Sequence, residues 1–260
     1  MTFPKFLLLM LSAAVLITSC KDDDNNDTPP QEDPTAENKK ALGESAEDLL
    51  ANETYDRMVV EFVYSEGFRP MQETIDGFQT FLQNRLNKPG GVVFVETVID
   101  PPPGAPYNST EIREIEEANR TQFTTDDTIA VYVFFSDGSS FGDSSNSVTL
   151  GTAYRNTSMV VYEKTLRDIS SSTTLPVLEA TTLHHEMGHI LGLVNISEDD
   201  IHTEHEDEFR AKHCFVEECL MYFDASGLTK SEVARFLERR AQAPNFDPLC
   251  IEDLQAKGGK

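Results

Sequence analysis

Two histidines separated by three residues, with a glutamate after the first, carry the clearest chemical signal in this chain. They are His185, Glu186 and His189, within residues 182–195 (TLHHEMGHILGLVN). At about 100° per residue, the two imidazoles lie one helical turn apart on one face, where they can bind the same Zn²⁺. Glu186 borders that face without having to bind the metal, so it can take a proton from water and pass it to a leaving amine. The motif therefore predicts a zinc site on a helix.

The remaining histidines gather around this motif. All six histidines of the chain lie between residues 184 and 213, and six histidines have no structural reason to share one segment. His184 points about 100° away from His185 on the predicted helix, so we do not expect it to bind the metal. A third ligand must then come from the residues after the helix, where His202, His205 and His213 are the candidates.

The residues after the second histidine resemble a known family. The segment reads H-E-M-G-H-I-L-G-L-V-N from His185 to Asn195 and is similar to the metzincin pattern H-E-x-x-H-x-x-G-x-x-H. Gly192 matches the glycine that ends the metzincin helix, where a left-handed residue lets the chain turn sharply. Asn195 stands in place of the third histidine, and a neutral amide oxygen is a poor zinc ligand beside imidazoles.

A second matching segment lies downstream. Residues 213–223 (HCFVEECLMYF) resemble the H-C-x-x-x-x-C-x-M-x-F segment of archaemetzincins. The resemblance implies that His213 is the third zinc ligand and that Met221 lies in a methionine turn beneath the metal. It also implies an acidic insertion, residues 195–212, ahead of that ligand. His205 is the main alternative ligand, and a carboxylate of the insertion is another.

The cysteines after residue 20 are Cys214, Cys219 and Cys250. Archaemetzincins carry a further C-x-x-C that helps to hold a second zinc, whereas only Cys250 follows here. The departure from that pattern, together with an oxidising compartment, leads us to expect a Cys214–Cys219 or a Cys214–Cys250 disulfide instead of a second zinc. The choice between these two pairings stays open.

The beginning of the chain predicts export and lipidation. Residues 6–18 form an apolar run of the length of a signal-peptide core, too short for a membrane span. The run ends in I-T-S-C, which resembles a bacterial lipobox with cleavage before Cys20 and lipid on its thiol. A plain secretory signal is the alternative. The K-D-D-D run that follows looks like the acidic export tags of surface lipoproteins, so we expect the cell envelope of a Gram-negative bacterium, at the outer membrane or cell surface.

Composition sets the domain organisation and the partners. We expect a signal peptide over residues 1–19, lipidated Cys20 with an acidic disordered tether to residue 40, and one zinc metallopeptidase domain over residues 41–260. With 45 acidic and 21 basic residues the net charge is −24, which argues against nucleic-acid partners. A protein or peptide substrate, membrane contact through the lipid only, and a monomer are expected.

Strand and helix patterns alternate along the domain. We expect strands at residues 57–64, 92–99, 129–135, 148–154 and 158–162, and helices at 40–51, 70–86, 108–119, from 173 or 174 through the zinc motif, and 229–241. The βαβαβ order predicts an α/β (α+β) fold with a twisted, mostly parallel sheet, the active-site helix and a C-terminal helix. The resemblance implies that residues 148–154 form an antiparallel edge strand that binds an extended peptide.

Two functions follow from these observations. The resemblance implies a lipid-anchored zinc endopeptidase of metzincin type. The contrasting hypothesis is a non-catalytic surface binding or structural lipoprotein that retains a zinc-stabilised metzincin fold. Asn195 keeps the second hypothesis open. Glu186 favours the first, because a purely structural zinc site needs no base.

Overall fold

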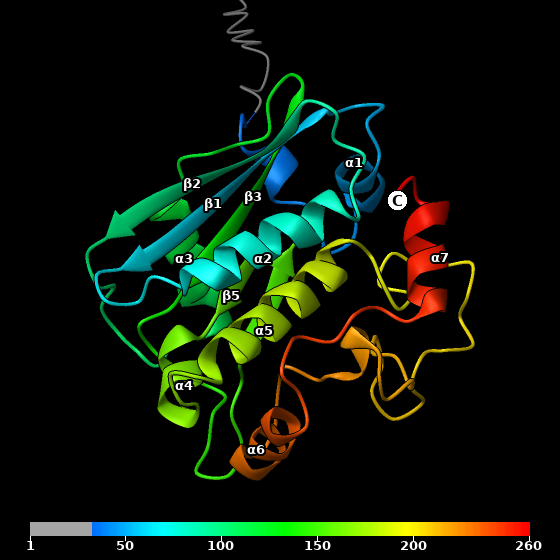
Figure 1. Ribbon diagram of the computed structural model, residues 1–260. Coiled ribbons are helices and arrows are strands. Elements are labelled where there is room, and N and C mark those ends of the chain that lie inside the picture. The colour runs from blue at the N-terminus through cyan, green and yellow to red at the C-terminus, as the bar shows by residue number, and fades with distance from the viewer. Residues whose placement is uncertain (1–32) are drawn as a thin grey trace, which may run out of the picture. The chain divides into compact units, whose positions relative to one another are not determined.

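The computed structural model describes residues 33–260 (Figure 1). The strands are β1 Arg57–Ser65, β2 Gly91–Ile99, β3 Thr128–Phe135, β4 Gly151–Arg155 and β5 Ser158–Val161. The helices are α1 Ala46–Leu50, α2 Gln72–Gln83, α3 Ser109–Asn119, α4 Glu163–Ile169, α5 Leu175–Ile190, α6 Lys230–Glu238 and α7 Pro248–Ala256, with 3-10 turns η1 Ala36–Asn38 and η2 Leu220–Tyr222. The predicted signal peptide, Cys20 and most of the predicted tether lie outside the described residues.

The five strands form one sheet in the order β2-β1-β3-β5-β4. Strands β2, β1, β3 and β5 run parallel to one another, and β4 pairs with β5 in the antiparallel direction at the edge. This arrangement confirms the predicted α/β fold with a mostly parallel sheet. The edge strand begins later than predicted: Val148 pairs with Leu228, and the Leu150 N–H donates to the Ala225 carbonyl outside the sheet.

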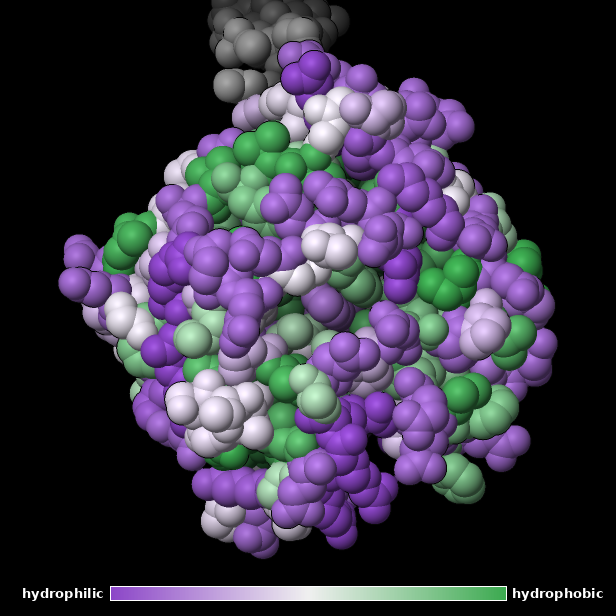
Figure 2. Space-filling model, in the orientation of Figure 1, coloured by the Kyte–Doolittle hydropathy of each residue, from purple (hydrophilic) through white to green (hydrophobic). Residues whose placement is uncertain are grey.

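Helices cover both faces of the sheet. In Figure 1, α2 and α5 lie in front of the strands and α3 lies behind them. The strand β3 is buried from Ile129 to Phe135, as a continuous apolar run between two covered faces should be. Its side chains alternate between the core beneath α2 and α5 and the smaller core beneath α3. Figure 2 shows hydrophilic residues over most of the visible face of the domain, with hydrophobic ones in small groups.

The folded part of the chain begins earlier than the sequence predicts. Residues 34–260 form one compact unit, so the last residues of the predicted tether belong to it. Asn38 is buried, and its side-chain amide donates to the Thr124 hydroxyl (2.9 Å) and to the Ala130 carbonyl (3.1 Å). The Asn38 side chain is buried because buried polar groups such as the Ala130 carbonyl require hydrogen-bond partners. The polar composition of the segment does not predict this burial.

Two helices were not predicted, α4 and α7. Helix α7 begins where the Asp247 carboxylate accepts the N–H groups of Leu249 and Cys250, with Pro248 in its first turn. Aspartate followed by proline is a recognised helix start, so this signal was present in the sequence. The helix α6 begins at a cap formed by Thr229 and Glu232 and ends at Glu238, sooner than the predicted residue 241. No helix among residues 33–260 is long and apolar enough to cross a membrane.

Two buried carboxyl groups, one on α4 and one on α5, interact with each other. Glu163 of α4 and Glu179 of α5 each have one carboxyl oxygen without a hydrogen-bond partner, whereas Arg167 donates to the other oxygen of Glu163 (2.5 Å) and Thr74 to that of Glu179 (2.5 Å). Burial, together with the charge of Glu179, raises the pKa of Glu163 to about 9, and burial raises the pKa of Glu179. A proton shared by the pair removes the repulsion between them.

This carboxyl pair makes stability depend on pH. Between about pH 4.5 and about pH 9 the folded protein holds a proton on Glu163 that the unfolded chain has released. Stability should therefore fall as the pH rises through this window, by up to about 1.4 kcal/mol per pH unit for each proton held. Urea unfolding at about pH 5.5 and about pH 8.5 would show a smaller difference in Glu163→Gln than in the wild type, with the exposed Glu73→Gln as control. Equal pH dependence in both variants would contradict a shared proton.

Candidate metal centre

The helix α5 carries three of the predicted site residues, His185, Glu186 and His189. It begins after Thr174, with Pro176 in its first turn, as the sequence predicts. Because it lies between the sheet and the segment around η2, its C-terminal half is buried on every side. His185 is 1% exposed and Glu186 is 3% exposed. The motif is therefore withdrawn from bulk water but opens into a cleft at one side.

The third histidine of the cluster is His213. Its ring stacks on that of His185 at 5.2 Å between centroids, and the ring of His189 stands perpendicular to both, at 5.1 Å and 4.6 Å. One nitrogen from each of the three rings lies within 4.8 Å of the other two. Three imidazoles that converge in this way form the donor set of a zinc site with an open fourth position.

Hydrogen bonds and burial prepare these rings to bind a metal. The Nδ1 atom of His185 lies 3.2 Å from the Leu220 carbonyl, and that of His213 lies 3.1 Å from the Ala211 carbonyl. An Nδ1–H that donates to a carbonyl leaves Nε2 of the same ring free to bind metal. Burial, with the nearby charge of His213, lowers the pKa of His185 to about 3. The ring is therefore neutral, as a metal ligand must be.

Met221 lies directly under the motif. A side-chain carbon at Gly188, which lies between the two helical histidines, would come within 2.5 Å of the Met221 sulfur. The glycine therefore lets the methionine pack against the helix backbone beneath the cluster. Phe223, two residues later, meets the His185 ring edge-on at 6.2 Å. The placement of Met221 beneath a bound metal stays a prediction.

Glu186 faces the edge strand β4. Its carboxylate accepts the backbone N–H of Ala153 at 2.7 Å, on the side of β4 away from β5. A side-chain carbon at Gly151 would lie 2.9 Å from the Glu186 side chain, so this glycine makes room for the carboxylate. Burial raises the pKa of Glu186 to about 8. The three histidines, Glu186 and β4 line a cleft of about 250 Å³.

The other motif residues have structural roles. His184 is outside the cluster, as predicted, because its ring stacks on Phe81 at 4.2 Å. Gly192 ends the helix with a positive φ of 79°, which confirms the predicted turn. Asn195 also has a positive φ, and its carbonyl accepts a hydrogen bond from Lys212. No carboxylate of residues 195–212 joins the three histidines.

His205 lies in a second group, which the sequence did not predict. It is fully buried with Cys214, Cys250 and Asp247, and one donor atom from each lies within 4.8 Å of the others. Cys219 lies beside them, with its sulfur 3.7 Å from that of Cys250. All three cysteines are free. The predicted disulfide is therefore wrong, because the thiols point at a histidine and a carboxylate instead of forming a covalent pair.

Comparison with solved structures finds a likeness in fold. The fold is similar to that of archaemetzincin from Methanopyrus kandleri, with 20% sequence identity, 78% of this chain and 96% of that chain covered, and a TM-score of 0.49. No protein-family model matches the chain, and no curated protein matches its sequence. The functional proposal below therefore depends on the residues of this chain and their geometry.

Proposed function

We propose that this protein is a zinc-dependent endopeptidase whose metal is held by His185, His189 and His213. The observation that carries the proposal is the convergence of these three imidazoles beside Glu186, at the edge of a sheet. A structural zinc site would be closed by a fourth protein ligand. This cluster instead opens into a cleft that also contains a carboxylate.

The strand β4 offers a place for the substrate. An edge strand leaves backbone groups unpaired on its outer side, and an extended peptide can pair with them as an additional strand. Glu186 contacts that outer side at the Ala153 N–H. A peptide bound along β4 would therefore pass directly beside the carboxylate and the three histidines. This position suits cleavage within a chain.

The proposed chemistry uses Glu186 as the base. Zinc, when bound by the histidines, supplies a Lewis acid for the scissile carbonyl and lowers the pKa of water. Glu186 takes the proton from the attacking water and gives it to the leaving amine, so one carboxylate serves both halves of the reaction. Its Ala153 hydrogen bond holds the side chain in the cleft, and burial favours its protonated form after the first transfer.

The proposal can be tested on the purified full chain. The protein should cleave members of an unbiased peptide library, lose this activity with a metal chelator, and regain it when Zn²⁺ is added. Product sequences should show new termini inside the peptides, as expected of an endopeptidase. A zinc-loaded protein that cleaves no peptide would contradict the proposal and favour a non-catalytic binding lipoprotein.

We also propose that the protein is anchored to the cell envelope through lipid on Cys20. The support is the lipobox-like I-T-S-C at the end of an apolar run and the acidic stretch that follows. Cys20→Ala should move the protein from the membrane fraction to the soluble fraction and remove a labelled acyl chain, whereas Ser19→Ala, which keeps a small residue before the cysteine, should change neither. Unchanged fractionation of Cys20→Ala, without acyl label on the wild type, would contradict lipidation.

A further inference from the structure

Two segments that are distant in the sequence form one wall of the peptidase cleft. Leu42, which follows the predicted tether, and Ile196, at the beginning of the acidic insertion, both line the cleft. Both side chains are half-buried. Apolar side chains at the edge of a cleft gain contact area when an apolar group of a ligand covers them. This wall is therefore a place where a substrate side chain can be recognised.

The two segments pack directly against each other. A side-chain carbon at Gly43 would lie 2.7 Å from the Cγ2 atom of Ile196, so the glycine lets Ile196 pack on the backbone next to Leu42. Gly43 also has a φ of +85°, which side chains rarely allow. Leu42 and Ile196 are therefore neighbours in one apolar surface, which we call the apolar wall.

Asn156, in the turn between β4 and β5, fixes the first segment. It is fully buried, and its backbone N–H donates to the Lys40 carbonyl at 3.2 Å. Its side-chain amide donates to the Glu37 carbonyl and to the Ser45 hydroxyl, both at 2.8 Å. Residues on both sides of Leu42 are therefore held by the same buried side chain. This contact places the apolar wall at the C-terminal end of β4.

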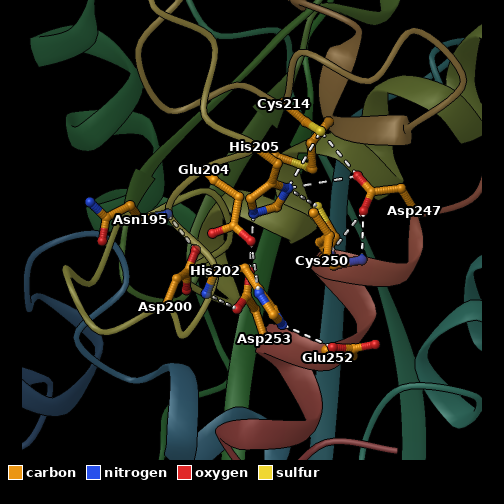
Figure 3. A network of polar contacts seen from close by, with 12 residues as sticks. Asn195, Asp200, His202, Glu204, His205, Cys214, Asp247, Cys250, Glu252 and Asp253 are labelled. Atoms are coloured by element: carbon orange, nitrogen blue, oxygen red, sulfur yellow. Dashed lines mark hydrogen bonds and ion pairs between the residues drawn. The ribbon is translucent and has the colours of Figure 1, made fainter.

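Hydrogen bonds at the neck of the insertion fix the second segment. Figure 3 shows Asn195 beside Asp200, whose carboxylate accepts the Asn195 backbone N–H at 2.5 Å. The Asn195 carbonyl accepts a hydrogen bond from the Lys212 ammonium at 2.6 Å. The insertion therefore begins and ends at the same point, directly before His213. Ile196 follows this closed neck, so its position is coupled to that of the third histidine.

The apolar wall lies at one end of the cleft. Ala225 and Ser226 line the other end, where the Ala225 carbonyl accepts the N–H of Leu150 just before β4. Glu186 contacts β4 between the two ends, at Ala153. A peptide that adds to β4 in the antiparallel direction, the commoner pairing, would begin at the apolar wall and run toward Ala225. The apolar wall would then meet side chains that precede the scissile bond.

We propose that Leu42 and Ile196 form a subsite that selects substrates with a large apolar side chain before the scissile bond. This inference rests on the proposed function, whose substrate preference it specifies. Selection of an acidic side chain by Lys212, which also lines the cleft, is the alternative. The Lys212 ammonium already donates to the Asn195 carbonyl at the neck of the insertion, so we assign it to the support of the apolar wall.

Peptides that differ only before the scissile bond test this subsite on the full chain. The wild type should cleave a peptide with leucine in the selected position at least about 10-fold better, in kcat/KM, than one with alanine or glutamate. Leu42→Ala and Ile196→Ala should each reduce this ratio several-fold. Leu42→Ala should also shift the preference toward phenylalanine, because a larger side chain fills the vacated space. A general disturbance of the fold would lower all rates without such a shift.

Ile201→Ala is the matched control. Ile201 belongs to the same insertion, but it is 61% exposed and does not line the cleft, so the preference for leucine should be unchanged. Equal cleavage of the leucine, alanine and glutamate peptides by the wild type would overturn the proposal. A preference for glutamate would favour Lys212 instead, and selection located only after the scissile bond would place the subsite elsewhere.

Binding measurements separate this proposal from the proposed function. Zinc-loaded Glu186→Gln should bind a fluorescently labelled leucine peptide more tightly than the alanine peptide, and adding Leu42→Ala should remove the difference. This result, with a wild type that cleaves nothing, would support the subsite and contradict the peptidase. Cleavage without any preference would contradict the subsite alone. A chain that neither binds nor cleaves these peptides would contradict both.

Discussion

Glu186→Gln should retain the zinc content of the wild type and lower peptide cleavage by about 10²–10⁴-fold, the usual contribution of one positioned base. Glutamine has nearly the same shape, and its amide oxygen can still accept the Ala153 N–H that now binds the carboxylate. It cannot accept the proton of the attacking water. The loss should therefore appear in kcat, since the cleft and the three histidines are unchanged.

The measurement combines cleavage rates with elemental analysis of the same samples. Glu232→Gln is a matched control, because it makes the same chemical change at the exposed cap of α6, and it should cleave peptides at the wild-type rate. Full activity of Glu186→Gln would exclude Glu186 as the base. Loss of zinc with loss of activity would show that Glu186 binds the metal, contrary to the proposal.

His213→Ala should weaken zinc binding at the peptidase cleft and abolish cleavage. It leaves two helical histidines, and two imidazoles make a poor zinc site. The zinc affinity should fall by more than the about 10–100-fold that is usual when a hydrogen-bond partner of a zinc ligand is removed. Equilibrium dialysis against a zinc buffer would measure it.

His205→Ala distinguishes the two candidate third ligands. His205 lies with the cysteines and away from the helical histidines, so its removal should leave zinc bound at the His185 and His189 site. His202→Ala should likewise leave zinc bound at the three-histidine site. If His213→Ala kept the ion of the cleft while His205→Ala lost it, His205 would be the third ligand of the peptidase site. That result would contradict the geometry described here.

The sequence alone determined those features that depend on local spacing. The interval between His185 and His189 places both rings on one helical face, because 3.6 residues make a turn. Continuous apolar strands interrupted by helical periods predicted a mostly parallel sheet, which the structure has. Each signal is contained in a few neighbouring residues, so no knowledge of distant contacts was needed.

The tertiary structure decided how distant residues meet. Spacing along the chain could not show that Cys250 of α7 lies beside His205, and the missing C-x-x-C therefore led to an incorrect disulfide. Burial of Asn38 and the pairing of Glu163 with Glu179 have the same origin. In each case a polar group interacts with a group on another element, because packing buries both groups away from water and buried polar groups require partners. Contacts between residues one helical turn apart can be predicted from the sequence, whereas contacts between different elements depend on the tertiary fold that brings those elements together.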